Sequence, residues 1–455
     1  MGLINSIPDS FRIFVDGKDR LRLTPDSIKW LESGTYLVTL KKNLFLDSTF
    51  AVDVTEGERS QLLINFTINS RFRGSLTIES RPPGAQIFLN DSNTTHITPW
   101  TLQNLLPGIY KITLKKNNYG DYTFYREVSS SKNIVSNSTL IDTTKWEYFN
   151  TGNSNIVSNG LSSITIDNSD NLWIGSREGL INYNGSIWSS IVPGDSKLPH
   201  KVVNYVQVDE QDRLWAVTVG GMALLQNGRV AVRFTNTGGQ GVIGTGFGTD
   251  SLNSILVSRG EPYYYATDIG FGSAREGSPF TFSFNFAKIP NTNNKITCFE
   301  KFDQNTALIG TAGSGLVVLT GLENYKIYNR TNSNMPGNSI SAMYKDNNGV
   351  WIGHLPGAGT GGGISFFDGS QFTVDNLRVP PPEISSIFVS SKGYKFIGTD
   401  VGVFVFEDFT NKVLLNEESE GLPIKDVSGI TEDSKGNIWI TTKGDGVFKL
   451  KKSPL

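Results

Sequence analysis

The chain has 455 residues, of which 11% are aromatic and 48 are glycine, and its formal charge at pH 7 is −2. This length exceeds one ordinary hydrophobic core, and the near-neutral balance excludes the basic field that a nucleic-acid-binding surface needs. The single cysteine, Cys298, excludes an internal disulfide framework and a cysteine-based metal site. No apolar run reaches the roughly 18 residues of a membrane-spanning helix, so no transmembrane segment is predicted.

The N-terminal third contains two copies of one segment, because residues 4–66 match residues 78–140 at a constant offset of 74. Leu40–Asn43, for example, falls on Leu114–Asn117 without a gap. Apolar residues alternate with polar ones within each copy, as in Phe11–Val15, and a period of two is typical of half-buried strands. Each copy is therefore predicted to be a small antiparallel β-sandwich.

The second copy carries a family motif. It reads Ser-Arg-Pro-Pro-Gly-Ala at Ser80–Ala85, Thr-Pro at Thr98–Pro99 and Leu-Pro-Gly-Ile-Tyr at Leu106–Tyr110. This pattern resembles a PEGA domain. In the first copy Pro8–Phe11 replaces the Pro-Gly-Ala core, so its link to the family rests on the internal offset. The resemblance implies an extracytoplasmic module of a bacterial envelope or surface protein, with a spacer or adhesion role and no catalytic residues.

A second repeat fills the rest of the chain and centres on Leu-Trp-Ile-Gly at Leu172–Gly175. The residue at the tryptophan position recurs at intervals of 42 to 50 residues. Its copies are Trp173, Trp215, Tyr265 in the most degenerate copy, Leu308, Trp351, Phe396 and Trp439. A strand-rich repeat of this length predicts the blades of a β-propeller, and seven copies predict seven blades.

Each blade is predicted to contain four strands, a to d. Asn-Gly and Asp-Gly pairs, such as Asn184-Gly185 and Asp368-Gly369, predict tight hairpins between strands c and d. The last blade ends without room for strand d, and we expect residues 145–149 to pair with it and close the ring. The predicted fold class is all-β: two small antiparallel β-sandwich domains, 1–70 and 71–141, followed by a seven-bladed β-propeller, 142–455, closed by the strand at about 145–149.

The pattern Leu-Trp-Ile-Gly-x-x-x-Gly-Leu-x-x-Tyr-Asn-Gly at residues 172–185 resembles the two-component regulator propeller repeat. That family builds periplasmic sensor portions of hybrid histidine kinases and also occurs in stand-alone secreted or lipid-anchored proteins. The resemblance therefore implies a bacterial periplasmic or surface location, with a lipid anchor supplied by a leader that precedes this sequence. This chain lacks the transmembrane, kinase and receiver parts of such sensors.

Several motifs have a structural and a chemical interpretation. The repeat aromatics are expected in the core rather than as platforms for sugars. The turns at 167–171, 346–349 and 433–437 faintly resemble calcium loops, but no bidentate Glu follows, and Asx turns are favoured. Two Gly-rich insertions, 238–248 and 357–363, are expected to be loops over one face, because the Gly-x-Gly-x-x-Gly of the second leads into a strand rather than a helix.

Candidate binding residues lie where the repeat leaves polar side chains on loops. We define the mouth as the propeller face that carries the loops between strands b and c. Polar residues expected there, directly after strand b, are Arg177, Glu178, Arg275, Glu276, His354, Asp400 and Lys443. Solvated loop residues and ion pairs are the alternative interpretation; a ligand site, if present, is expected at this mouth. Function is expected where the repeat breaks, in blade three and the two insertions.

The histidines, His96, His200 and His354, are scattered, and no carboxylate spacing supports a metal site. No catalytic residue, cofactor or metal is therefore predicted. The leading interpretation is a non-catalytic envelope protein, monomeric, that presents its propeller on sandwich spacers to a protein partner or an oligosaccharide. One alternative is the extracytoplasmic sensor module of a two-component system that binds a glycan fragment. Another is a lyase or glycosidase acting at the mouth, with carboxylates that meet only in space.

Overall fold

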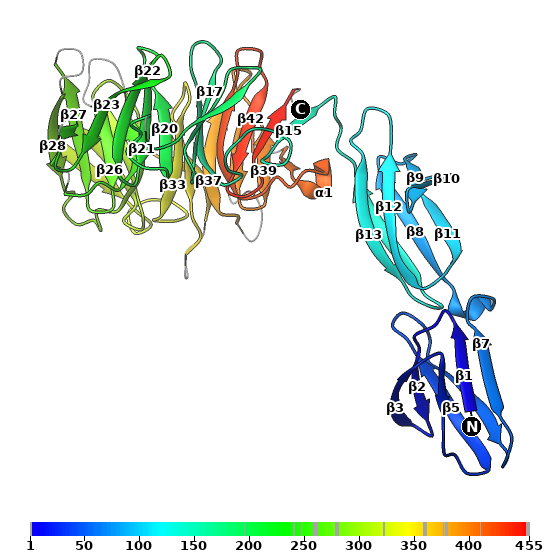
Figure 1. The fold of residues 1–455 in the computed structure, drawn as a ribbon. Helices are drawn as coiled ribbons and strands as arrows, with labels where there is room; N and C mark the ends of the chain where they lie inside the picture. Colours follow the sequence, from blue (N-terminus) through cyan, green and yellow to red (C-terminus); the bar gives the residue numbers. More distant parts are fainter. Residues whose placement is uncertain are drawn as a thin grey trace. The chain divides into compact units, whose positions relative to one another are not determined.

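The computed structural model describes residues 2–194, 196–239, 242–246, 248–257, 263–277, 282–321, 324–357, 362–375, 377, 381–409 and 411–451. Contacts within the chain divide it into two compact units, Met1–Thr143 and Thr144–Leu455, both built from strands (Figure 1). No helix in the described ranges has the length and apolar character to cross a bilayer.

The first unit holds two sandwiches. In the first, sheet β4-β1-β7 faces sheet β3-β2-β5-β6. Its strands are β1 (Gly2–Ile7), β2 (Arg12–Val15), β3 (Lys18–Leu23), β4 (Asp26–Ile28), β5 (Gly34–Lys41), β6 (Ser48–Val54) and β7 (Ser60–Asn65).

The second sandwich repeats this order, with sheet β11-β8-β14 and sheet β10-β9-β12-β13. Its elements are the short 3-10 helix η1 (Ser70–Phe72), β8 (Gly74–Arg81), β9 (Gln86–Leu89), β10 (Ser92–Ile97), β11 (Trp100–Leu105), β12 (Gly108–Lys115), β13 (Tyr122–Val128) and β14 (Asn133–Thr139). The internal repeat in sequence is thus a repeat of fold. One detail differs from the predicted antiparallel pattern: β1 pairs with β7, and β8 with β14, in parallel.

The family motif forms a buried polar contact in both copies. Thr98 Oγ1 accepts a hydrogen bond from Ala85 N at 3.0 Å and lies 2.5 Å from Ser80 Oγ. In the first copy Thr24 Oγ1 accepts from Phe11 N at 3.0 Å and contacts Ser6 Oγ. The threonine of Thr-Pro therefore ties the two sheets together in each copy, although the first copy has lost the Pro-Gly-Ala core.

The described residues of the second unit form seven consecutive sheets, the seven blades. Blade one is β16 (Leu161–Ile166), β17 (Leu172–Ser176), β18 (Leu180–Tyr183) and β19 (Trp188–Ile191); blade two is β20 (Val203–Val208), β21 (Leu214–Thr218), β22 (Gly221–Gln226), β23 (Arg229–Thr235) and β24 (Ile243–Gly244). Blade three is β25 (Leu252–Leu256), β26 (Tyr263–Thr267), β27 (Phe271–Glu276) and β28 (Phe282–Ala287); blade four is β29 (Ile296–Lys301), β30 (Thr306–Thr311), β31 (Leu316–Thr320) and β32 (Asn324–Tyr328).

The remaining blades follow the same plan. Blade five is β33 (Ile340–Lys345), β34 (Val350–His354), β35 (Gly363–Phe367) and β36 (Phe372–Asp375); blade six is β37 (Ile384–Val389), β38 (Lys395–Thr399), β39 (Gly402–Phe406) and β40 (Val413–Leu415), followed by the short helix α1 (Glu417–Glu420). Blade seven is β41 (Val427–Glu432), β42 (Ile438–Thr442), β43 (Val447–Leu450) and β15 (Trp146–Phe149).

Strand β15 supplies the missing fourth strand of blade seven, which confirms the predicted pairing of residues 145–149. It runs antiparallel to β43, with Tyr148 opposite Phe448 and the two rings stacked 4.6 Å apart. The Trp146 indole N–H donates to Glu420 Oε2 at 2.8 Å. Side chains of blades one and seven, including Leu172 and Trp439, share one buried core. The first and last blades therefore pack on each other.

The repeat tryptophans are core residues, as predicted, and their indoles also bond to the chain. Trp173 Nε1 donates to Asp167 Oδ2 at 2.9 Å, while Asp167 Oδ1 accepts from the backbone N of Ser169 and Asn171. The same indole–carboxylate bond joins Trp215 to Asp209, Trp351 to Asp346 and Trp439 to Asp433. The Asx-turn interpretation is confirmed, because these carboxylates accept from the chain's own donors.

Blade three is a complete four-stranded blade, but its predicted alignment is wrong by one residue. Thr267 ends β26 opposite Leu252, as Ser176 ends β17 opposite Leu161, so Tyr264 rather than Tyr265 occupies the tryptophan position. A shift of one residue moves a side chain to the other face of a strand. Tyr264 accordingly packs with Phe299 of blade four, and Tyr265 packs with the core that holds Trp215 of blade two.

A series of hydrogen bonds links the innermost strands of neighbouring blades. The second residue of strand a in one blade donates to the first carbonyl of strand a in the next: Ser162 to Val203, Asn204 to Leu252, Asn253 to Ile296, Thr297 to Ile340 and Ser385 to Val427. Ser341 occupies the same position in blade five, but its buried hydroxyl has no partner among the described residues. These bonds hold the blades in register around the axis.

Candidate functional site

The loops of the mouth begin from a rigid turn that recurs in six of the described blades. Ser176, the last residue of β17, donates its hydroxyl to Gly179 O at 2.7 Å and accepts from Glu178 N at 3.2 Å. The corresponding hydroxyls that donate across the turn belong to Thr218, Thr267, Thr311, Thr399 and Thr442. Side chains that follow strand b therefore project from a fixed backbone.

His354 replaces this hydroxyl in blade five, and its predicted place among the exposed mouth residues is wrong. The side chain is 0% exposed. Nδ1 lies 2.8 Å from Gly337 O and Nε2 lies 2.7 Å from Ser365 Oγ. A carbonyl can only accept, so Nδ1 carries the proton and Nε2 accepts from the serine. Burial lowers the pKa of His354 to about 4. The imidazole is a neutral structural link.

Arg275 and Glu276 are also not at the mouth. Thr267 closes a short turn onto Gly270 O at 2.8 Å, so strand c occupies Phe271–Glu276 and carries both residues to the opposite face. The sequence prediction failed there because no repeat motif fixes strand c in this degenerate blade. Arg275 and Glu276 are therefore no longer candidates for binding a ligand at the mouth.

Glu276 instead belongs to a buried ion cluster that the sequence analysis missed. Arg213 donates to Asp209 Oδ2 and to Glu276 Oε2, both at 2.8 Å, with 5% of its side chain exposed. Its guanidinium also donates to Tyr263 Oη at 3.2 Å. Burial opposes the charge, but the hydrogen bonds and fields of Glu276 and Asp209 more than offset this, and the pKa of Arg213 is raised. The cluster joins blade two to blade three.

A sequence signal for this cluster exists in the repeat itself. Asn171 and Asn437 donate to the turn aspartates of blades one and seven, Asp167 and Asp433. Blade two has Arg213 at that position. An arginine in place of a short amide, next to a buried strand, indicates a longer-range partner.

The other predicted residues do lie at the ends of their b strands. Arg177, Glu178 and Lys443 are exposed, and Asp400 is half-buried. Glu178 forms an ion pair with Lys201 at 2.9 Å, and about half of each side chain is exposed. Asp400 Oδ1 accepts from Glu383 N at 2.9 Å. Glu178 and Asp400 are therefore partly used by the chain, in line with the ion-pair alternative.

The structure brings Arg177 and Lys443 close together across Gly160. A Cβ atom built on Gly160 would lie 3.3 Å from Lys443 O and 3.6 Å from Arg177 Cδ. Arg177 N donates to Gly160 O at 3.3 Å. Because Gly160 has no side chain, the loops of blades seven and one can approach each other closely at this point.

Backbone hydrogen bonds extend this meeting point to blade six. Lys443 N donates to Asp426 O at 2.9 Å, and Asp426 N donates to Asp400 O at 3.2 Å. The three loops form a continuous arc, which we call the six–seven–one arc, consisting of Asp400, Asp426, Lys443, Gly160 and Arg177. Along the arc from blade six to blade one, the carboxylates of Asp400 and Asp426 are followed by the exposed cations of Lys443 and Arg177. Such an arc can bind a polar ligand through several weak contacts.

A separate carboxyl lies at the axial strands. Glu300 accepts from Lys301 N at 2.8 Å and from Lys345 N at 3.2 Å. Burial raises the pKa of Glu300 to about 7. Burial also raises the pKa of the nearby Cys298 thiol, with a smaller contribution from the Glu300 charge.

The described ranges contain no group of three or more His, Cys, Asp or Glu side chains placed to hold a metal ion. His200 Nδ1 accepts from Val202 N at 3.0 Å, and His96 stacks on Trp100 in the other unit. Both Gly-rich insertions lie partly outside the described residues. The described part of the first contains β24, which adds a fifth strand to blade two.

Comparison with protein families supports both resemblances. Residues 73–141 match the PEGA domain, and residues 334–355 and 421–444 match the two component regulator propeller. The two propeller segments contain strands a and b of blade five and of blade seven. A search of curated proteins gave no match.

Solved structures share the fold. The extracellular domain of a hybrid two-component system from B. thetaiotaomicron has a TM-score of 0.56 and 21% identity, covering 68% of this chain and 42% of that one. Virginiamycin B lyase from Staphylococcus aureus has a TM-score of 0.53 and 12% identity, covering 68% and 99%. PorZ, a surface component of the type-IX secretion system of Porphyromonas gingivalis, has a TM-score of 0.53 and 12% identity, covering 96% and 65%. The chain thus spans less than half of the two-component domain.

Proposed function

We propose that this chain, which carries a PEGA domain and two-component regulator propeller repeats, is a non-catalytic binding module of the bacterial cell envelope. In this proposal the chain has three domains: two sandwich spacers are followed in sequence by a propeller that binds an oligosaccharide or a protein at its mouth. The observation that carries the proposal is the six–seven–one arc, where loops of three blades meet beside Gly160 with charges of both signs. The envelope location rests on the two family matches and on the extracellular neighbours.

The chemistry of the arc favours binding over catalysis. A catalytic acid or base needs a perturbed pKa and access to substrate. The histidine with the strongly shifted pKa, His354, has no exposed surface and both ring nitrogens engaged. Glu300 lies at the axis, on β29, and not among the arc residues. The likeness to virginiamycin B lyase, at 12% identity, supports the fold alone.

A thermal-shift screen against oligosaccharides tests the proposal. A ligand that binds the native state raises the unfolding temperature, by roughly 2.7 kcal/mol of added stability at a hundred times its dissociation constant. A reproducible shift that Arg177→Ala with Lys443→Ala abolishes supports an oligosaccharide site in the arc. Arg229→Ala with Lys435→Ala is the matched control, since it removes the same two charges from exposed positions on the opposite face. A shift lost equally in both double variants contradicts the arc as the site.

An extracytoplasmic sensor module is the second candidate, favoured by the match to the two component regulator propeller. As a sensor, the chain would bind a glycan fragment and pass the signal to a partner protein. The oligosaccharide screen tests whether a glycan binds, and a measurement of partner binding then distinguishes the sensor from the scaffold. If glycan binding occurs, addition of the glycan should change the binding of a partner captured from the native envelope. A partner that binds with the same affinity with and without glycan argues for a scaffold.

A further inference from the structure

One loop of the propeller contributes both to the six–seven–one arc and to the contacts of β15, the first strand of the propeller. This loop, residues 416–426, joins β40 of blade six to β41 of blade seven and contains α1, so we call it the α1 loop (Figure 1). At its end Asp426 N donates to Asp400 O at 3.2 Å, and Asp426 O accepts from Lys443 N at 2.9 Å. In its middle lies Glu420, the last residue of α1.

Glu420 holds the start of β15. Its two carboxylate oxygens each accept from Lys145 Nζ at 2.8 Å, and Oε2 also accepts from Trp146 Nε1 at 2.8 Å. The ion pair is shielded from water, with 24% of the Lys145 side chain and 13% of the Glu420 side chain exposed. Removal of the carboxylate would leave the buried Trp146 N–H without this acceptor, which is costly. We call these three residues the clasp.

The segment that connects the clasp to the arc is short and buried. Gly421 ends α1 in the left-handed region, with φ 72. Leu422 and Ile424 follow, with exposed fractions of 0% and 1%. Because protein interiors are closely packed, side chains buried in this way shift together rather than independently. A displacement of Asp426 at the arc is therefore expected to reach Glu420.

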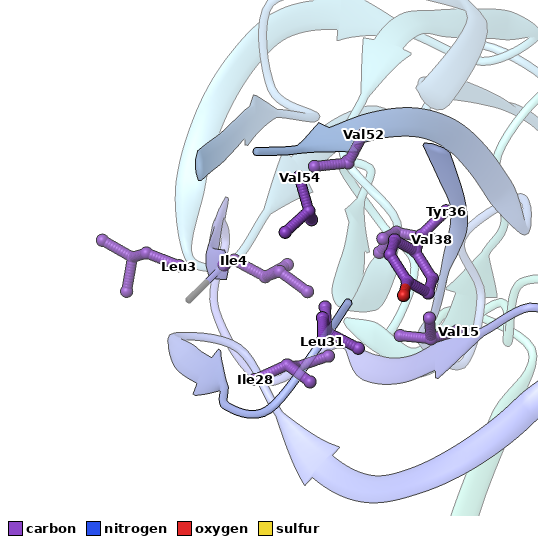
Figure 2. A pocket seen from close by; sticks show the side chains of 10 residues that line it. Leu3, Ile4, Val15, Ile28, Leu31, Tyr36, Val38, Val52 and Val54 are labelled. Atoms are coloured by element: carbon purple, nitrogen blue, oxygen red, sulfur yellow. The ribbon is translucent and has the colours of Figure 1, made fainter. Parts of the chain in front are cut away.

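The space between the sheets of the first sandwich is too small for a ligand. Figure 2 shows Ile4, Val15 and Val38 among the apolar side chains around it. Its volume is about 10 Å³, which is room for at most one water molecule. A ligand is therefore expected at the propeller. The chain passes from the sandwich unit to the propeller between Thr143 and Thr144, directly before the clasp.

We propose that the α1 loop couples ligand binding at the arc to the clasp, so that an occupied arc strengthens the hold of Glu420 on Lys145 and Trp146. The proposal rests on the function proposed for the arc and adds how binding there acts on the rest of the chain. A ligand that contacts Lys443 and Asp426 orders the α1 loop, and an ordered loop loses less conformational freedom when it forms the clasp. Linkage requires the reverse as well: the clasp strengthens ligand binding by the same factor.

Hydrogen exchange of the full chain tests this coupling without any ligand. Glu420→Gln breaks the clasp, and the Lys443 amide, which donates to Asp426 O, should then exchange at least about fivefold faster, the lower end of typical coupling between sites. Blade four contains the same backbone bond, from Ala312 N to Lys295 O at 2.9 Å. Exchange of the Ala312 amide should not change, which separates the coupling from a general loss of stability.

Glu147→Gln is the matched control variant. It also removes a carboxylate that holds β15, since Glu147 pairs with Lys451 at 3.0 Å and with Lys449 at 3.5 Å. These partners lie at the end of β43 rather than on the α1 loop. Exchange of the Lys443 amide should therefore stay as in the wild type. Equal acceleration by both variants, or none by Glu420→Gln, overturns the proposal.

The oligosaccharide with the largest thermal shift in the screen is the probe for the reverse effect. It should slow the exchange of the β15 amides relative to that of Ala312, and its affinity for Glu420→Gln should be at least about fivefold weaker than for the wild type. Glu147→Gln should bind it like the wild type. Unchanged affinity in Glu420→Gln contradicts the coupling. Absence of binding by every oligosaccharide contradicts the function proposed for the arc, and the exchange rates in Glu420→Gln then decide the coupling alone.

Discussion

Blades one and seven have an asparagine, Asn171 or Asn437, two residues before the repeat tryptophan, whereas blade two has Arg213 at this position. This difference shows how the repeat is adapted. In blades one and seven, the asparagine closes the a–b turn within its own blade. In blade two, Arg213 takes that place and reaches Glu276 of blade three at 2.8 Å. A position that serves one blade in the regular repeat thus holds two blades together where the repeat is most degenerate. Blade three lacks a tryptophan and gains an ion cluster.

The largest expected effect follows from removing this link. Arg213→Asn introduces the residue of blades one and seven and removes the guanidinium that pairs with Glu276, whose side chain is 14% exposed. Breaking a buried ion pair on one side typically costs about 3 to 5 kcal/mol. We expect a loss of this size in the propeller transition during denaturant unfolding. Lys201→Ala, which breaks the half-exposed pair with Glu178, is the control and should cost at most about 1 kcal/mol. Equal losses in the free energy of unfolding for the two variants would show that the buried cluster stabilises the propeller no more than the half-exposed ion pair does.

His354 sharpens the comparison in blade five, where it replaces the turn hydroxyl. Its pKa is lowered by burial to about 4 in the folded protein and is near 6.5 when unfolded. The unfolded chain therefore binds the proton first, and stability falls as the pH drops from 6.5 to 4, by up to about 3 kcal/mol. His354→Thr, the residue of blades two, three, four, six and seven, should flatten this dependence. An unchanged pH profile would contradict the burial of a neutral imidazole.

Glu300 predicts the opposite slope. Burial raises its pKa to about 7 in the folded state from 4.5 in the unfolded chain. Its contribution to stability is thus fully present below pH 4.5 and is lost as the pH rises through about 7. Relative to the wild type, Glu300→Gln should gain about 2 kcal/mol of stability between pH 5 and pH 8, a value reduced for partial solvent access. A pH-independent difference would show that Glu300 ionises as it does in water.

The smallest expected effect compares two buried tryptophans. Trp439 Nε1 donates to Asp433 Oδ2 at 2.9 Å, whereas the buried Trp188 Nε1 has no hydrogen-bond partner among the described residues. Trp439→Phe should therefore cost about 1 kcal/mol more than Trp188→Phe, measured by chemical denaturation of the two variants. A smaller loss for Trp439→Phe would mean that the indole–carboxylate bond does not stabilise the repeat.

Most of the fold could be predicted from the sequence because every copy of the repeat buries the same strand in the same way. Seven copies of one buried strand predicted the seven blades, and the offset of 74 residues predicted the paired sandwiches. The missing last strand predicted the pairing of β15 with β43. Where the motif decays, as at Tyr264 and Tyr265, hydrophobic pattern alone could not fix the register, because three consecutive tyrosines fit either face.

The candidate site was predicted less well, for a physical reason. Position after strand b placed Arg177 and Lys443 on their loops, but only the packing of blade seven on blade one brings these two loops together at Gly160. The buried states of His354 and Arg213 depend on partners 17 and 63 residues away in sequence. The repeat shows that Arg213 replaces a short amide, but no local pattern identifies the partner of either residue.

The central claim is that the propeller binds through the six–seven–one arc rather than through its opposite face. Its most direct measurement compares the affinity of the best oligosaccharide from the screen for two double variants, Arg177→Ala with Lys443→Ala and Arg229→Ala with Lys435→Ala. Loss of two charged contacts should weaken binding to the first variant at least about tenfold and leave the second unchanged. Equal affinities of the two variants, or a weaker second variant, would contradict the claim.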